Sequence, residues 1–204
     1  MKTYKQTTRY TSAASSLMMT IQHFNPDFLL TKENEFLLWQ RSATLPTRGS
    51  SIYALAILAK EQGIPSKIIV EEPDYKFPGY RFKAYKKAEI EVAAYTSELF
   101  HDRAKELNIP IEECNFKLDE VKKYLEEGKL VMLRLIVGIM RNTKSNRRNP
   151  HYVLIKSAKL KNDALVFEIL DSKKGKLLIT EQRLKDSFEA VKECKRDNRM
   201  IVFG

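Results

Sequence analysis

Residues 6–19 read QTTRYTSAASSLMM, and this stretch predicts the fold. Thr11 or Ser12 can cap a helix, because a hydroxyl there accepts a hydrogen bond from a free N–H group of the first turn. Apolar residues then recur at helical spacing as far as Phe24. Gln6 stands six residues before Ser12. Taken alone, Ser12 is an ordinary N-cap serine, but a hydroxyl or thiol at a helix N-terminus also lies where the helix dipole favours negative charge.

Two polar residues at strand ends extend this pattern downstream. His151 opens the apolar stretch HYVLI, and Asp171 closes the next predicted strand. A histidine at the start of a strand can act as general base and acid, and a carboxylate one strand over can orient its imidazole. The Gln6 amide and the backbone N–H of Ser12 would then stabilise an oxyanion. Without this context, His151 is an ordinary edge histidine and Asp171 is a turn residue.

Helical and strand patterns occupy different parts of the chain. Helical patterns cover roughly residues 12–24, 32–42, 52–59, 86–107, 118–127 and 181–191, and strand patterns cover 67–71, 130–137, 151–157, 165–170, 176–179 and 200–203. This order predicts an α+β fold in which an N-terminal helical lobe packs on a C-terminal, mostly antiparallel sheet. At 204 residues the chain fits a single domain, residues 1–204, with a helical part at about 1–128 and a sheet part at about 129–204.

The chain is basic, with 36 Lys and Arg residues against 26 Asp and Glu and a formal net charge of +10. Such a balance favours acidic partners, but it is also typical of a lysine-rich solvated surface. Nucleic acid is not indicated beyond this net charge, because no nucleic-acid-binding signature is present. Four cations lead directly into the histidine strand: Arg141, Lys144, Arg147 and Arg148. We predict that they bind an acidic segment of a peptide or protein substrate; the alternative is a solvated charge run.

Cys114 and Cys194 are too few for a disulfide framework, and no metal-ligand spacing occurs. We therefore expect no metal and no cofactor. The N-terminus lacks the apolar core of a signal peptide. The longest apolar run, residues 130–140, contains Arg134 and is too short to span a bilayer. We expect a soluble, cytoplasmic protein with no membrane partner, and the sequence leaves the oligomeric state open.

Three segments of the chain resemble the sequence boxes of one peptidase family. Residues 6–19 resemble the cysteine box of the bacteriocin-processing, or double-glycine, peptidases, which are family thirty-nine of the cysteine peptidases. Residues 149–153 (NPHYV) resemble its histidine box, and residues 169–171 (ILD) its aspartate box. The likeness is greater to the stand-alone prokaryotic branch, whose members often begin Gln-Thr-Thr-x-Tyr-Thr-Cys. It spans the chain and implies a papain-like fold with a nucleophile position, a base, an orienting carboxylate and an oxyanion donor: Ser12, His151, Asp171 and Gln6.

Ser12 stands where the resembled family has its catalytic cysteine. A serine keeps its proton where a thiol would ionise, so we expect the chain to be inactive or nearly so. A Cys→Ser exchange is isosteric and preserves fold and substrate binding. We therefore favour an inactivated form of a cysteine hydrolase, engineered or pseudo-enzyme, over a native serine enzyme. Lesser departures are Ala13 and Ala14, where Gly and Pro are common, and Ser172, where Pro usually follows the Asp.

The resemblance leaves three functional hypotheses. The first is a thiol protease or amide hydrolase that works through an acyl-enzyme. The second is a non-catalytic peptide-binding module, as in family members fused to transporters that have lost the cysteine. The third is an acyltransferase on the same fold, in which an amine instead of water accepts the acyl group. The presence of Gln6, His151 and Asp171 favours an enzyme, because a pure binding module has no need of them.

Overall fold

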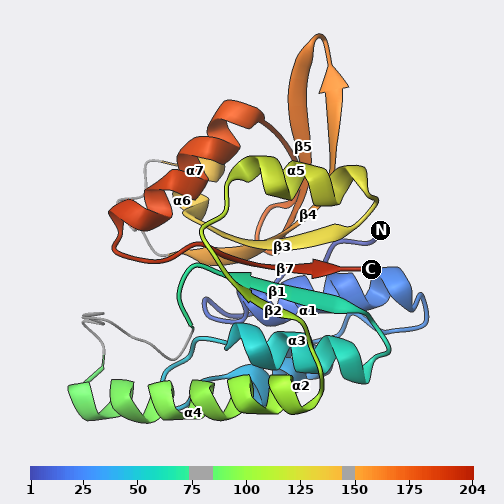
Figure 1. Cartoon of the computed structure of the whole chain (residues 1–204). Helices are drawn as coiled ribbons and strands as arrows, with labels where there is room; N and C mark the ends of the chain where they lie inside the picture. The colour runs from blue at the N-terminus through green and yellow to red at the C-terminus, as the bar shows by residue number, and fades with distance from the viewer. Residues whose placement is uncertain (74–84, 144–149) are drawn as a thin grey trace.

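One mixed sheet runs through the molecule and carries helices on both faces (Figure 1). The computed structural model describes residues 1–73, 85–143 and 150–204. In these residues seven strands lie in the order β2-β1-β7-β3-β4-β5-β6. The strands are β1 (Ser66–Val70), β2 (Ile111–Glu113), β3 (Leu130–Leu135), β4 (His151–Lys161), β5 (Ala164–Asp171), β6 (Gly175–Thr180) and β7 (Arg199–Phe203). The helices are α1 (Ser12–Phe24), α2 (Lys32–Ser42), α3 (Ile52–Glu61), α4 (Lys87–Glu106), α5 (Leu118–Glu126), α6 (Val137–Met140) and α7 (Glu181–Glu193). The predicted α+β class is confirmed.

The sheet takes two of its strands from the first 128 residues. β1 pairs in parallel with β2 and antiparallel with β7, and β7 continues antiparallel to β3. The pairs β3–β4, β4–β5 and β5–β6 are also antiparallel. β2 was missing from the sequence prediction, because three residues are too few to show a strand period and the strand exists through its pairing with β1.

The strand predicted at residues 130–137 ends earlier than expected. β3 stops at Leu135, and the chain turns into α6. The cause is a pair of hydrogen bonds with α7: the N–H of Ile136 donates to the carbonyl of Ser187, and Ser187 Oγ donates to the carbonyl of Ile136. Because α7 satisfies both backbone groups of Ile136, this residue has no need of a strand partner.

Side chains from both faces of the sheet are buried. Along β7, Ile201 and Phe203 belong to the core on the side of α1 and α3, whereas Met200 and Val202 belong to the core on the side of α5 and α7. Successive strand residues point to opposite faces. Two covered faces therefore explain why this strand reads as a continuous apolar run instead of an alternating one.

α1 is buried on nearly every side, because it lies between the sheet and two other helices. It packs on β4, α2 and α3. Leu17, Met18, Met19 and Ile21 are fully buried, and burial of each such side chain contributes roughly 1.5–3 kcal/mol. The helix is thereby fixed along its length, and so is the residue at its N-terminus.

Candidate active site

The N-terminus of α1 meets the start of β4. Ser12 is the first residue of α1, and its Oγ lies 3.1 Å from Nδ1 of His151, the first residue of β4. One turn along α1, Ser16 Oγ donates to the carbonyl of Tyr152 at 3.4 Å, so the same helix and strand are joined a second time. Ser12 is only 6% exposed, which shields its hydroxyl from bulk water. The structure thus brings the predicted nucleophile position and the predicted base together.

His151 is held in its neutral form. Burial lowers the pKa of His151 from 6.5 to about 4; the positive charge of Arg141 adds to this effect and the negative charge of Asp171 opposes it. With its proton on Nε2, the neutral ring accepts a hydrogen bond from the Ser12 hydroxyl through Nδ1. The imidazole therefore has the protonation state of a general base at neutral pH, but its low pKa makes it a weak one.

Asp171 is fully buried and is held by Arg141 and by its own turn. Nε and Nη2 of Arg141 lie 3.1 and 2.6 Å from Oδ2, and the backbone N–H groups of Lys173 and Lys174 donate to Oδ1 at 2.9 and 2.7 Å. Within the part of the chain that the structure describes, no hydrogen bond joins Asp171 to His151. The predicted orienting role of Asp171 stays a prediction, and Arg141, predicted to bind substrate, is engaged by this carboxylate.

Gln6 is fixed against the turn between β5 and β6 by two contacts with Ser172. Its backbone N–H donates to the Ser172 carbonyl at 2.8 Å, and Ser172 Oγ donates to Gln6 Oε1. The side-chain Nε2 donates to the carbonyl of Thr8. Both ends of the amide are thus engaged, and among the described contacts none joins it to Ser12. An oxyanion role requires exchange of the Thr8 bond for a bond to substrate, so this role stays a prediction.

A buried carboxylate anchors residues 1–11, which we call the N-terminal arm. Glu35 of α2 is fully buried. Its Oε1 accepts from the Thr7 N–H at 2.9 Å and from the Thr11 hydroxyl, and its Oε2 accepts from the Tyr4 hydroxyl at 2.8 Å. Thr11 is the N-cap of α1, yet its side chain makes no capping bond. Sequence reasoning missed Glu35, because nothing in the pattern separates it from the exposed Glu33 on the same helical turn.

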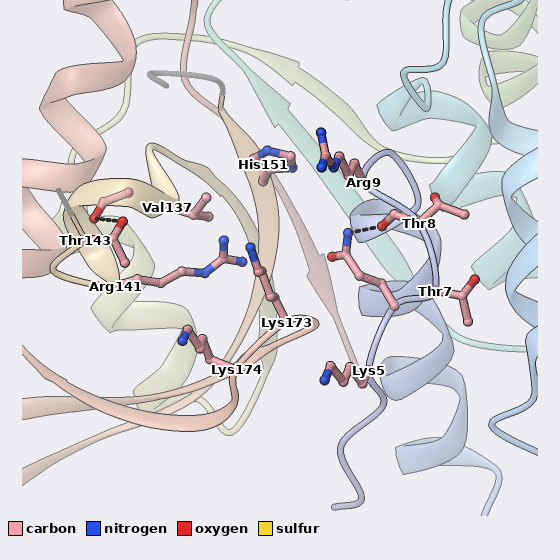
Figure 2. A pocket seen from close by; sticks show the side chains of 12 residues that line it. Lys5, Thr7, Thr8, Arg9, Val137, Arg141, Thr143, His151, Lys173 and Lys174 are labelled. Atoms are coloured by element: carbon pink, nitrogen blue, oxygen red, sulfur yellow. Dashed lines mark hydrogen bonds between the residues drawn. The ribbon is translucent and has the colours of Figure 1, made fainter. Parts of the chain in front are cut away.

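An open cleft of about 800 Å³ lies beside His151 (Figure 2). This volume is within the range of about 300–1,000 Å³ that is usual for ligand sites. The N-terminal arm, the segment around α6 and the β5–β6 turn contribute its walls, and they bring five cations to it: Lys5, Arg9, Arg141, Lys173 and Lys174. Among the described residues that line the cleft, none is acidic. The sequence pointed to Arg141 alone of these five, because the other four reach the cleft from the arm and the turn.

The remaining predicted substrate-binding residues, Lys144, Arg147 and Arg148, lie outside the described residues, and their role stays a prediction. In residues 1–73, 85–143 and 150–204, no group of three or more His, Cys, Asp or Glu side chains is arranged to hold a metal ion. Over the same residues, no helix combines the length and the apolar character needed to cross a membrane.

Neither cysteine belongs to this site. No disulfide joins Cys114 and Cys194. Burial raises the pKa of the Cys114 thiol, and Glu112, whose Oε1 lies 3.4 Å from Cys114 Sγ, raises it further. Cys194 is the C-cap residue, directly after the last residue of α7. Position 12, at the start of α1, therefore stays the predicted nucleophile position.

The comparison with protein-family models identifies the family. The model of the Peptidase_C39 like family matches residues 1–194, which include Ser12, His151 and Asp171. Among solved structures, a double glycine motif protease from an AMS/PCAT transporter in complex with the leader peptide is similar, with 16% sequence identity, a TM-score of 0.48 and coverage of 98% of this chain and 89% of that chain. No curated protein matches the sequence. The family match extends over nearly the whole chain, and the chain therefore belongs to the Peptidase_C39 like family.

Proposed function

We propose that the chain has the site of a papain-like peptidase or amide hydrolase and that its cleft binds a peptide or protein segment. Because Ser12 occupies the nucleophile position, hydrolysis is very slow or absent. The observation that carries this proposal is the 3.1 Å contact between Ser12 Oγ and His151 Nδ1 at the start of a buried helix. A nucleophile position, a neutral base and free N–H groups at a helix N-terminus are the elements that acyl transfer requires.

The chemistry depends on the atom at position 12. A thiol there would give up its proton to His151 and attack a substrate carbonyl, and His151 would return the proton to the leaving amine. Water would then hydrolyse the acyl-enzyme. The Ser12 hydroxyl is a much weaker acid than a thiol, and a base with a pKa of about 4 removes its proton poorly. The serine form therefore keeps the contact between position 12 and His151, but proton transfer from the hydroxyl to the imidazole is too unfavourable for efficient catalysis.

The test is the reactivity of the thiol introduced by Ser12→Cys. Iodoacetamide labelling at pH 7, followed by mass spectrometry of the peptides, should modify position 12 faster than Cys114 or Cys194. A helix N-terminus lowers a thiol pKa, whereas that of Cys114 is raised. Adding His151→Ala to the same variant should slow labelling at position 12 alone. Equal labelling rates at the three cysteines would rule out an activated nucleophile position.

Two alternatives share this fold and are separated by the same variant. A chromogenic thioester acylates the introduced thiol in either enzyme. Release of the free acid in water then indicates a hydrolase, and transfer to an added primary amine at the expense of the acid indicates an acyltransferase. A non-catalytic binding module would bind peptide but would show no burst of acylation after Ser12→Cys.

A further inference from the structure

The cleft is lined by His151, which contacts Ser12, and its charged residues are strongly one-sided in sign. Lys5 and Arg9 lie on the N-terminal arm, and Lys173 and Lys174 lie on the turn between β5 and β6. Figure 2 shows His151 and Arg9 at one end of the cleft and Lys5 and Lys174 at the other. Positive charge thus extends along the cleft from the histidine outward.

These four cations have no ion-pair partner among the carboxylates that the structure describes. All four side chains are exposed, and none forms an ion pair with a described carboxylate. The fifth cation of the cleft, Arg141, differs because it is paired with the buried Asp171. Like charges held close together repel one another, and a cleft lined by one sign of charge concentrates ligands of the opposite sign.

The two walls that carry these cations are fixed to each other. The N–H of Gln6 donates to the Ser172 carbonyl at 2.8 Å, which joins the arm to the β5–β6 turn between Lys5 and the two lysines of the turn. The arm is also anchored to Glu35 through Thr7. The positive charges therefore sit on a pre-organised frame, which reduces the entropy lost when a ligand binds.

We propose that the substrate of this site is an acidic peptide segment, with Asp or Glu side chains within a few residues of the bond presented to position 12. This inference rests on the proposed function, and it adds the substrate class. Carboxylates along an extended peptide would meet Lys5, Lys173 and Lys174, each as an exposed charge-assisted contact.

The lining of the cleft favours a peptide over a single-stranded nucleic acid. Proteins that bind single strands combine positive charge with aromatic side chains on which bases stack. Apart from the His151 imidazole, the described lining contains no aromatic ring, and its uncharged members are small or polar, such as Thr7, Thr8 and Gly138. Carboxylates need no stacking surface, and threonine hydroxyls can bind a peptide backbone.

The experiment measures binding by the chain with Ser12 in place, so that no turnover is needed. Fluorescence anisotropy compares a fluorescein-labelled hexaglutamate peptide with the matched hexaglutamine peptide. The acidic peptide should bind about tenfold or more tightly at low salt, and the difference should shrink as salt shortens the Debye length. The cleft variant Lys5→Gln/Lys173→Gln/Lys174→Gln should remove most of the preference.

A matched control removes the same charge elsewhere. Lys105→Gln/Lys123→Gln/Lys161→Gln replaces three exposed lysines outside the cleft and should leave the preference nearly intact. Equal weakening by the two triple variants would assign the effect to net charge and overturn the proposal. Equal affinity for the two peptides would also overturn it. A single-stranded oligonucleotide that binds as tightly as hexaglutamate, with the same loss in the cleft variant, would replace the peptide as ligand.

The outcomes separate this inference from the proposed function. If the thiol of Ser12→Cys is activated but the acidic preference is absent, the peptidase-like site stands and the substrate class is wrong. If the acidic preference is present but the introduced thiol is no more reactive than Cys114, the cleft binds acidic peptides and the proposed activation of position 12 by His151 is wrong.

Discussion

Arg141 forms an ion pair through two nitrogens with Oδ2 of Asp171 in the interior of the protein. The side chains are 12% and 0% exposed. This pair acts on His151 in two ways: it neutralises the carboxylate that would stabilise an imidazolium, and it places a positive charge near the ring. Burial is the main cause of the low pKa of His151, about 4, and the positive charge of Arg141 lowers it further against the opposing charge of Asp171.

Arg141→Gln should therefore raise the pKa of His151. The positive charge that disfavours the imidazolium is lost, and Asp171 is left as an unneutralised carboxylate nearby. We expect a rise of about one unit or more, measured by NMR titration of the imidazole Cε1–H signal. The charge-conserving Arg141→Lys should leave the pKa close to that of the parent. An unchanged pKa in Arg141→Gln would contradict the electrostatic account.

The same substitution should destabilise the fold. Asp171 would keep its hydrogen bonds to the backbone N–H groups of Lys173 and Lys174 but would lose its charge partner. Removal of one member of a buried ion pair costs on the order of 3 kcal/mol. Urea denaturation at pH 7 measures this loss. Arg41→Gln, which breaks the exposed pair with Glu61, is a suitable control and should cost about 0.5 kcal/mol or less.

His151 should make the protein less stable in mild acid. Its pKa is about 4 in the folded state, against about 6.5 for an exposed imidazole. Between these values the unfolded chain binds a proton that the folded chain does not, so the free energy of unfolding falls as the pH drops from about 6.5 to about 4. The full contribution is at most about 3 kcal/mol.

Comparison with His151→Gln isolates this effect. As the pH falls from about 6.5 to about 4, the free energy of unfolding of the parent should decrease relative to that of the variant. Below about pH 4 the difference between the two should become constant. His23→Gln, at an exposed position, should show a much smaller change. Stability curves of parent and His151→Gln that run parallel from pH 7 to pH 4 would show that His151 is not buried in its neutral form.

Glu35 should be important for both stability and the site. Its carboxylate accepts hydrogen bonds from Tyr4, Thr7 and Thr11 with no exposure to solvent. Glu35→Gln leaves one acceptor oxygen instead of two and should destabilise the protein by about 1–3 kcal/mol in urea denaturation. Hydrogen exchange of the Thr7 amide should speed up more than exchange in the sheet. Glu33→Gln is the matched control, because Glu33 lies on the same turn of α2 and is exposed. This change should alter stability by less than about 0.5 kcal/mol.

The sequence predicts the helices of this fold well and the sheet less completely. Residues 12–24 and 32–42 could be bounded in advance, because Asn25-Pro26 marks the end of the first helix and the capping residue Thr31 marks the start of the second. β2 and the early end of β3 could not, since both depend on partners distant in sequence. Pairing with β1 forms β2, and the two hydrogen bonds between Ile136 and Ser187 end β3 early.

The same division holds for the site. Ser12 and His151 were predicted as partners because the sequence around each resembles a box of one peptidase family, and the structure places Ser12 Oγ 3.1 Å from His151 Nδ1. The partner of Asp171 could not be predicted, because an arginine in a basic run carries no sign of which carboxylate it meets. Glu35 was missed for a similar reason: burial of a charged residue is decided by tertiary contacts, here with the arm at Thr7.

The last prediction separates the oxyanion role of Gln6 from nucleophile activation. Alkylation by iodoacetamide requires a thiolate but no oxyanion, whereas acylation by a thioester requires both. In the Ser12→Cys background, Gln6→Ala should leave the iodoacetamide rate within about twofold and lower the acylation rate by about 10²–10³-fold, the usual loss for one oxyanion donor. Ser172→Ala, which removes only the hydroxyl that holds Gln6 Oε1, should have a smaller effect on acylation. If Gln6→Ala slows both reactions equally, Gln6 supports the start of α1 and does not contact the oxyanion.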